Sequence, residues 1–192
     1  MASASHGLSE EAAERSLIRK PFQALRFEGR SEAPAEAVYD LLADLGSHLQ
    51  WAGAKQSETT RLLTMEAPAG PARVGTEFVT SGSDGKVARF EDRSVVTEAS
   101  RPAVFEFVTE SRRHGKPGSR PWHLTLIHHY EIESEPAGCR VTYAEEITRM
   151  SGAPRAFAMP GIRRLIYRIS ARYMRRGFDT LIAMAEEQTA VQ

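Results

Sequence analysis

The chain has 192 residues, of which 41% are hydrophobic and 26% charged, a mix that supports one globular domain with its own core. Its formal net charge is zero, which excludes a global positive field that would steer it to nucleic acid. Its single cysteine, Cys139, excludes an intramolecular disulfide and a cysteine-based metal cluster, and no apolar run approaches the ~20 residues of a membrane-spanning helix.

Residues 1–20 form a polar N-terminal segment, and residues 21–192 are expected to form a single domain. Ser9 is placed to cap a short helix through "EEAAERSLIRK", which has acids at its start and bases at its end. We expect at least the first eight residues to be disordered. The segment has neither the basic start nor the apolar centre of a secretion signal, so we expect a cytoplasmic protein.

Strands and helices are predicted in separate blocks. Residues 22–32 alternate as a first strand, and Pro34 then opens a helix with apolar residues at helical spacing from Val38 to Leu45. A second short helix or turn follows at "GSHLQWAG". Turn-rich sequence then separates six strands, at roughly 55–66, 73–82, 86–98, 103–112, 120–133 and 138–149. A long helix without proline runs from Gly161 to Gln188. This order predicts an α+β fold with a seven-stranded curved antiparallel sheet wrapped around a long C-terminal helix.

Four stretches within this order carry a family resemblance: "APAEAVYDLLADLGSHLQW", "VGTEF", "VVTEASRPAVFEF" and "GCRVTYAEEI". From about Phe22 to the C-terminus the chain resembles the START-like superfamily, also called SRPBCC or helix-grip, and especially its polyketide cyclase/dehydrase branch. Cys139 stands where the branch usually has threonine. The resemblance implies a START-like ligand-binding domain over residues 21–192. Its deep, mostly apolar cavity would lie between the sheet and the last helix, with mouth loops near 82–86, 112–120 and 149–160. The superfamily contains binders and enzymes, and no single catalytic motif transfers residue by residue.

Three histidines lie in "WHLTLIHHYEI", residues 122–132, and raise the question of a metal site. Successive side chains of a strand point to opposite faces, so His128 and His129 diverge. His123 and His129 share a face, but at ~3.3 Å per residue they stand ~20 Å apart, too far for one zinc ion with ligands at ~2 Å. We therefore expect no metal site here and no cofactor. His128 falls on the apolar face, as a hydrogen-bonded core histidine or as a polar contact or acid–base group for a ligand. His123 and His129 are expected to face solvent.

The last strand places an acid among apolar side chains. In "CRVTYAEEI", Glu145 shares a face with Val141, Tyr143 and Ile147, where loss of solvation raises a carboxyl pKa unless a cation lies nearby. Arg176 on the long helix is the expected partner of Glu145. The pair is either a structural ion pair or a ligand anchor. His128 and Glu145 are thus the two candidate catalytic residues.

The other candidate ligand-binding residues are mainly apolar, as small-molecule sites are. The sheet and the second short helix contribute Trp51, Phe78, Phe105, Phe107, Leu126, Tyr130 and Tyr143. The last helix and the loop before it contribute Met159, Ile162, Ile166, Ile169 and Tyr173. The stripe that begins at Ile162 is expected to continue to Met184 and to face the sheet.

The long helix also carries a strong local charge and a second apolar stripe. Between Ile147 and Phe178 no acid occurs, and eight arginines do: Arg149, Arg155, Arg163, Arg164, Arg168, Arg172, Arg175 and Arg176. This is either a solvated face or a surface for an anionic ligand head, an anionic membrane or an acidic protein such as an acyl carrier protein. The second stripe is Tyr167, Ala171, Met174, Phe178 and Ile182. If exposed, it predicts a homodimer or coverage by the N-terminal segment.

Three functions remain open at this level. The first is the binding or transport of a hydrophobic or amphipathic small molecule, lipid or polyketide-like, in the internal cavity. The second is a polyketide aromatase/cyclase-type enzyme, in which His128 or Glu145 moves a proton in the same cavity. The third is a protein-interaction module acting through the basic C-terminal helix. Nucleic acid is not an expected partner, because the arginines are not interleaved with exposed aromatic residues and no binding motif occurs.

Overall fold

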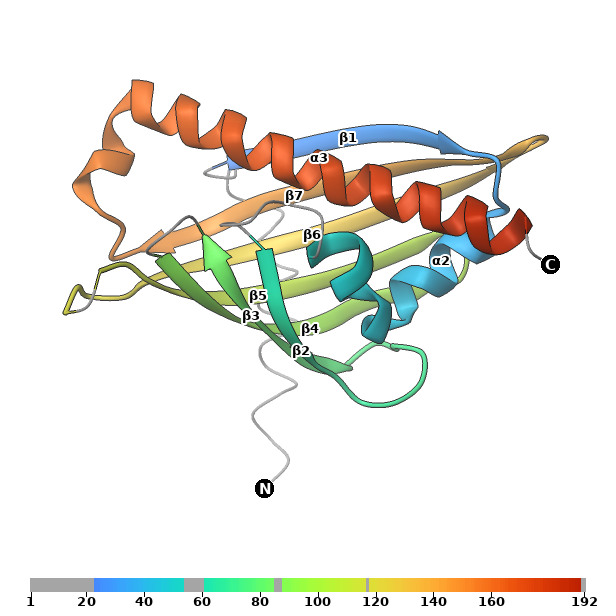
Figure 1. The fold of residues 1–192 in the computed structure, drawn as a ribbon, viewed down its shortest axis with the longest axis horizontal. Coiled ribbons are helices and arrows are strands. Elements are labelled where there is room, and N and C mark those ends of the chain that lie inside the picture. Colours follow the sequence, from blue (N-terminus) through green and yellow to red (C-terminus); the bar gives the residue numbers. More distant parts are fainter. Residues whose placement is uncertain (1–22, 54–60, 85–87, 117, 191–192) are drawn as a thin grey trace.

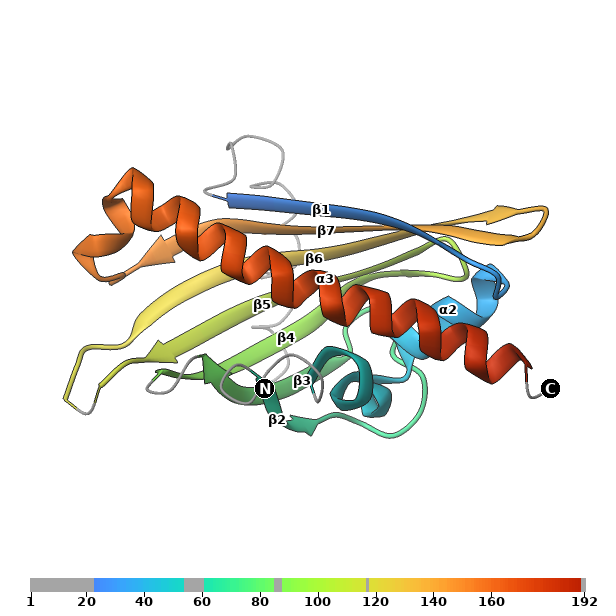
Figure 2. The ribbon, with the colours of Figure 1, turned by 45° about the horizontal axis from the view of Figure 1, so that its top comes forward.

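Seven antiparallel strands form one curved sheet, and a long helix runs across its inner side (Figures 1 and 2). A computed structural model describes residues 23–53, 61–84, 88–116 and 118–190, so the N-terminal segment lies outside the described residues. In chain order the elements are β1 (Gln23–Ser31), α2 (Ala35–Ala43), a 3-10 turn η1 (Leu45–Ser47), a π-helical turn η2 (Leu49–Gly53), β2 (Arg61–Glu66), β3 (Glu77–Asp84), β4 (Ala88–Ser100), β5 (Val104–His114), β6 (Trp122–Glu135), β7 (Gly138–Ser151), a 3-10 turn η3 (Arg155–Ala158) and α3 (Pro160–Ala190). The predicted α+β architecture is confirmed.

The strand order follows the chain except at one edge. The order is β1-β7-β6-β5-β4-β3-β2, so β2 to β7 are neighbours in sequence and β1 pairs with β7. The segment from α2 to η2 carries the chain from one edge of the sheet to the other. The face that α2 and α3 cover is called the inner face below, and the opposite one the outer face. The β3–β4, β5–β6 and β7–α3 connections all lie at one end of the sheet (Figure 1).

The first helix forms where the sequence predicts it. Pro34 precedes it with φ −64° and ψ 154°, an extended conformation that suits the residue before a helix. The apolar side chains from Val38 to Leu45 are buried. Tyr39 packs edge-on against Phe105 with ring centroids 5.9 Å apart, which fixes α2 on the sheet.

The third strand begins later in the chain than the sequence predicts. The third strand was expected from residue 73 but begins at Glu77, because Arg73 to Thr76 form a turn closed by two hydrogen bonds. Gly75 takes φ 85° in that turn, a conformation that glycine adopts without strain. The second strand begins at Arg61, and the predicted residues before it lie outside the described residues.

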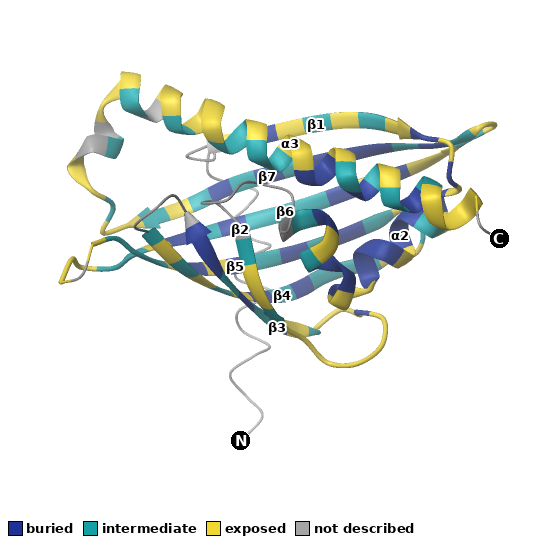
Figure 3. Ribbon diagram, viewed as in Figure 1, coloured by how far each residue is buried: buried dark blue, intermediate teal, exposed yellow. Residues whose placement is uncertain are grey.

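The core lies between the inner face, α2 and the C-terminal half of α3 (Figure 3). Four α3 residues are buried there, all beyond Arg176: Gly177, Phe178, Leu181 and Ala185. Phe178 stacks near Phe27 and Tyr143, with ring centroids 6.3 and 6.5 Å away. Gly29 permits this approach, because an added Cβ would lie 2.7 Å from Ile182 Cδ1 and 2.9 Å from Phe178 Cε1.

The two apolar stripes of α3 are therefore assigned wrongly by the sequence pattern. Met174, Phe178 and Ile182 of the second stripe pack on the core, so this part of the stripe is not a free surface for a dimer. Of the first stripe, Ile169 is 46% exposed instead of facing the sheet, whereas Met184 packs against the core as expected. Among the described residues, no helix is both long and apolar enough to cross a membrane.

Candidate functional site

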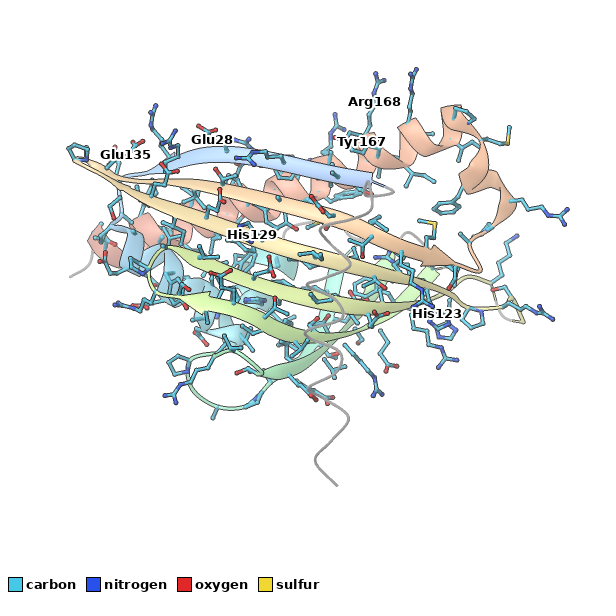
Figure 4. The ribbon with its side chains drawn as sticks, turned by 180° about the vertical axis from the view of Figure 1, so that it is seen from behind. Glu28, His123, His129, Glu135, Tyr167 and Arg168 are labelled. Carbon is cyan, nitrogen blue, oxygen red and sulfur yellow. The ribbon has the colours of Figure 1, made fainter. Side chains whose placement is uncertain are left out.

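The alternation of β6 places its three histidines as the sequence predicts. Leu124, Leu126, Tyr130 and Ile132 are buried on the inner face, and His128 lies in the same row. His129 points to the outer face, where Nδ1 lies 2.8 Å from Glu106 Oε2. His123 is exposed, and Figure 4 shows these two outer histidines well apart along β6. Within the described ranges, His, Cys, Asp and Glu side chains nowhere form a group of three that could hold a metal ion.

A chain of three polar side chains crosses from β6 to β7 on the inner face. His128 Nδ1 lies 2.8 Å from the Tyr143 hydroxyl, and that hydroxyl lies 3.4 Å from Glu145 Oε2. His128 and Glu145 are direct cross-strand partners, so the sheet register itself sets their separation. We call these three residues the polar chain.

Aromatic rings enclose the polar chain. Phe107 stacks on the His128 ring at 4.5 Å, and Tyr130 lies 4.5 Å from Tyr143, centroid to centroid. Phe107 comes from the neighbouring strand β5, at the position that pairs directly with His128. The three polar groups thus sit in a wall that is otherwise apolar, where each hydrogen bond is strengthened and each charge is penalised.

Burial sets the protonation of the polar chain. Loss of solvation lowers the pKa of His128 to about 3 and raises the pKa of Glu145 to about 7. His128 is therefore neutral at pH 7, and its 3.8 Å approach to the Glu145 carboxylate is not an ion pair. Glu145 changes its charge close to neutral pH instead.

The proton on Glu145 is coupled to the tautomer of His128. When Glu145 is protonated it donates to the Tyr143 oxygen, and the Tyr143 hydroxyl donates to an unprotonated His128 Nδ1. When Glu145 is ionised, the Tyr143 hydroxyl donates to its carboxylate and His128 Nδ1–H donates to Tyr143. Both arrangements satisfy the same contacts, so the chain can hold or release a proton without moving its heavy atoms.

A second buried histidine lies on the other side of Phe107. His48 in the α2–η2 segment donates from Nε2 to the Leu42 carbonyl oxygen at 3.1 Å, and its ring lies 4.5 Å from Trp51. Burial lowers the pKa of His48 to about 4. The sequence pattern does not identify His48 as a site residue, because a histidine in a short helical turn has no periodicity that would reveal which way it points.

The charge of Arg113, an arginine that the sequence did not nominate, acts on the pKa of Glu145, and a contact of Glu145 with the expected partner Arg176 stays a prediction. Loss of solvation is the main effect on the pKa of Glu145, and the Arg113 charge opposes it while Asp92 reinforces it. The Arg113 guanidinium lies over the Phe90 ring at 5.4 Å. Arg176 is exposed on α3. The alternation Phe105, Phe107, Thr109, Ser111, Arg113 would have revealed this placement, had the strand been extended past residue 112.

The inner face also holds polar groups toward the β3–β4 and β5–β6 end. Ser111 is 1% exposed and pairs across the sheet with Asp92. Within the described residues, the Ser111 hydroxyl has no hydrogen-bond partner. Two strand positions away, Ser94 and Thr109 bond to each other at 2.8 Å. A buried hydroxyl without a partner is costly and marks a place where a bound polar group would be stabilising.

The remaining predicted site residues separate into three groups. The structure brings together the aromatic residues of the sheet and Trp51, for Phe78 lies 5.4 Å from Phe107 and 6.1 Å from His48. Leu126 joins a small apolar cluster nearer the β5–β6 end, together with Leu124, Ile147, Trp122 and Met150. The α3 candidates do not converge on this wall: Met159 is 57% exposed, and Ile162, Ile166 and Tyr173 are only half-buried.

An open pocket of about 250 Å³ lies on the outer face of β5, β6 and β7. Its lining is polar and consists of Glu110, His123, Thr125, Arg149 and Ser151. The Thr125 hydroxyl donates to Glu110 at 2.9 Å, so one of its polar groups is already satisfied internally. The polar chain lies on the opposite face of the sheet from this pocket.

No protein-family model matches the chain, and no curated protein matches it. Solved structures do resemble it. An uncharacterised protein from Rhizobium leguminosarum has a TM-score of 0.59 at 15% identity, over 86% of this chain and 95% of its own. A protein from Thermus thermophilus has a TM-score of 0.59 at 17% identity, over 85% and 97%. One from Nitrosomonas europaea has a TM-score of 0.55 at 14% identity, over 88% and 99%. The curved antiparallel sheet with a C-terminal helix is thus a fold that this chain shares with these bacterial proteins, and at such low identity the likeness concerns the fold alone.

Proposed function

We propose that this chain binds an apolar or amphipathic small molecule, lipid or polyketide-like, on the inner face of its sheet. The sequence resemblance to the START-like superfamily supports this proposal, because binding between the sheet and the last helix is what that resemblance implies. The confirmed order of strands and helices is compatible with the same assignment.

The observation that carries the proposal is the polar chain within an aromatic wall. A wall of this kind with a few hydrogen-bonding groups is typical of small-molecule sites. His128 and Glu145 keep 14% and 9% of their side-chain surface accessible, so they are not sealed inside the core. A ligand would bury its apolar body against the Leu124–Leu126–Ile147 cluster and hydrogen-bond the polar chain.

The protonation states favour an uncharged polar group next to the polar chain. His128 is neutral at pH 7, and Glu145 is negative or neutral but never positive. A hydroxyl or carbonyl oxygen can accept a hydrogen bond from protonated Glu145, and a hydroxyl can also donate one to an unprotonated nitrogen of His128. An anionic head group, the expectation from the arginine-rich helix, would be placed nearer Arg113.

Native mass spectrometry of protein purified from its own host tests the proposal, followed by extraction and identification of the bound compound. We expect one small molecule per chain, retained less well by His128→Phe than by the control His129→Phe, which changes the adjacent side chain on the outer face. Titration with the apolar probe 1-anilinonaphthalene-8-sulfonate gives a second measurement. Equal retention by both variants, or the absence of both a bound compound and probe binding, would contradict the proposal.

One observation favours the aromatase/cyclase-type enzyme as a second candidate. Glu145 holds a proton close to neutral pH and is linked through Tyr143 to a neutral histidine, an arrangement suited to general acid–base catalysis. If the chain catalyses ring closure with loss of water, Glu145→Gln should retain a precursor heavier by one water than the compound on the wild-type protein. Identical compounds on both proteins would favour the binding function alone.

A further inference from the structure

Exposed apolar side chains are concentrated at the start of α3. Of six large hydrophobic residues that are exposed in the described structure, four fall within eleven consecutive positions: Met159, Leu165, Tyr167 and Ile169. Their exposed fractions run from 39% to 58%. No described side chain between Pro160 and Arg176 is fully buried, and most of those between Arg164 and Ile169 are exposed.

The same half of α3 is strongly positive. Arg164, Arg168 and Arg172 recur at a spacing of four and are all exposed, so they follow one side of the helix next to Leu165 and Ile169. Figure 4 shows Arg168 projecting from α3 away from the sheet. The sequence has no acid between Ile147 and Phe178 that could neutralise these arginines locally.

The neighbouring β5–β6 connection adds positive charge at the same end of the molecule (Figure 1). Arg112, Lys116 and Arg120 are exposed there. Net charge over the whole chain is zero, so the acids that balance the arginines of α3 lie in other segments of the chain. The electrostatic field is therefore directional and would orient the protein on an anionic surface.

We propose that the N-terminal half of α3 docks the protein on an anionic phospholipid bilayer. Arginines bind lipid phosphates, while the aliphatic side chains between them enter the boundary of the acyl region, as in helices that lie in the membrane interface. We call Met159, Leu165, Ile169, Arg164, Arg168 and Arg172 the docking face. The arginines and the aliphatic residues are interspersed on it, so a surface with phosphates above hydrocarbon satisfies both kinds of side chain. The proposal does not depend on the ligand-binding function, although docking would bring the inner face close to a source of lipid.

Co-sedimentation of the full-length protein with vesicles tests the docking face. We expect binding to vesicles of phosphatidylcholine with phosphatidylglycerol, little binding to phosphatidylcholine alone, and release at about 1 M salt, where the Debye length is ~3 Å. The variant Arg164→Gln/Arg168→Gln/Arg172→Gln should bind about a hundredfold more weakly, at about a factor of five for each arginine. Leu165→Ser/Ile169→Ser should also weaken binding without changing its salt dependence.

The matched control is Arg26→Gln/Arg93→Gln/Arg140→Gln, which removes the same charge from the outer face of the sheet and should retain binding. Circular dichroism and thermal unfolding establish that each variant folds. The proposal is overturned if the two triple variants bind equally, or if neutral and anionic vesicles bind alike. It is also overturned if the wild-type protein does not bind vesicles and instead self-associates or binds an acidic protein through the docking face. None of these outcomes depends on whether a ligand occupies the inner face.

Discussion

Replacing Glu145 by glutamine should make the protein more stable at pH 8 but not at pH 4.5. Glutamine keeps the shape of a protonated carboxyl and can still donate to the Tyr143 oxygen, so the substitution removes the ionisation and little else. The pKa of Glu145 is raised from its ordinary value of 4.5 to about 7, mainly because burial removes water from the carboxylate. Below pH 4.5 the carboxyl is mostly protonated in both the folded and the unfolded chain, so it does not lower the free energy of unfolding.

As the pH rises above 4.5, the unfolded chain releases this proton while the folded chain keeps it until about pH 7. The folded state therefore loses stability across that window, and the loss is complete above it. Each pH unit corresponds to ~1.4 kcal/mol, so the window from 4.5 to about 7 amounts to ~3 kcal/mol. This is an upper figure, because the carboxyl keeps some contact with solvent.

Urea denaturation at several pH values between 4.5 and 8.5 measures this effect. The difference in unfolding free energy between Glu145→Gln and the wild-type protein should grow by ~3 kcal/mol across the window. The control is Glu146→Gln, which removes the same charge one residue further along β7, from the other face of the sheet. A flat difference for Glu145→Gln would refute the reasoning, because it would mean that the carboxyl ionises as readily inside the sheet as in water.

Three further predictions concern the fold. Phe178→Ala should destabilise the protein by ~3–5 kcal/mol in denaturant titrations, because Phe178 is 2% exposed and joins α3 to β1; a loss below 1 kcal/mol would contradict its central role. Gly138→Ala should cost more than ~2 kcal/mol or prevent folding, since φ is 124° and the new Cβ would lie 2.0 Å from the Ser31 oxygen, whereas Gly161→Ala has open space and should change little. His129→Gln should destabilise most between pH 5 and 6, by ~1 kcal/mol. The His129–Glu106 contact raises the pKa of His129 and lowers that of Glu106, so its contribution is lost as pH rises through the histidine pKa and as pH falls through the glutamate pKa; equal effects at pH 5.5 and pH 9 would exclude this.

The side on which each strand residue lies was predictable, because a period of two leaves only two choices. That rule placed His128 and Glu145 on the inner face before any contact was known, and the register of β6 and β7 then made them neighbours. The contact through Tyr143 was not predictable, since it depends on which pairs of residues lie opposite each other across the sheet. Arg113 was missed because "RRHGKPGSR" resembles a loop, although β5 continues through its first three residues.

The orientation of α3 could not be derived from its own sequence. Both of its stripes are apolar, so periodicity does not say which one faces the sheet. The answer lies in β1, where Gly29 leaves room for Phe178 and Ile182. A glycine in a strand does not by itself indicate which helix packs against it. Only the folded structure shows that Gly29 contacts a helix about 150 residues further along the chain.

The uneven anchoring of α3 has a consequence for local unfolding. Its C-terminal half is held by Phe178 and Leu181 in the core and by Glu186, whose carboxylate accepts from the Glu32 amide at 2.9 Å. Its N-terminal half has no buried side chain among the described residues. Opening the first turns of α3 therefore breaks few contacts, whereas opening the last turns requires the whole core to come apart. Amide hydrogen exchange should accordingly be graded along one continuous helix, fast near Ile162 and as slow near Leu181 as global unfolding allows. The first turns of α3 would then move away from the sheet while its last turns stay packed, which would expose the inner face without unfolding the sheet.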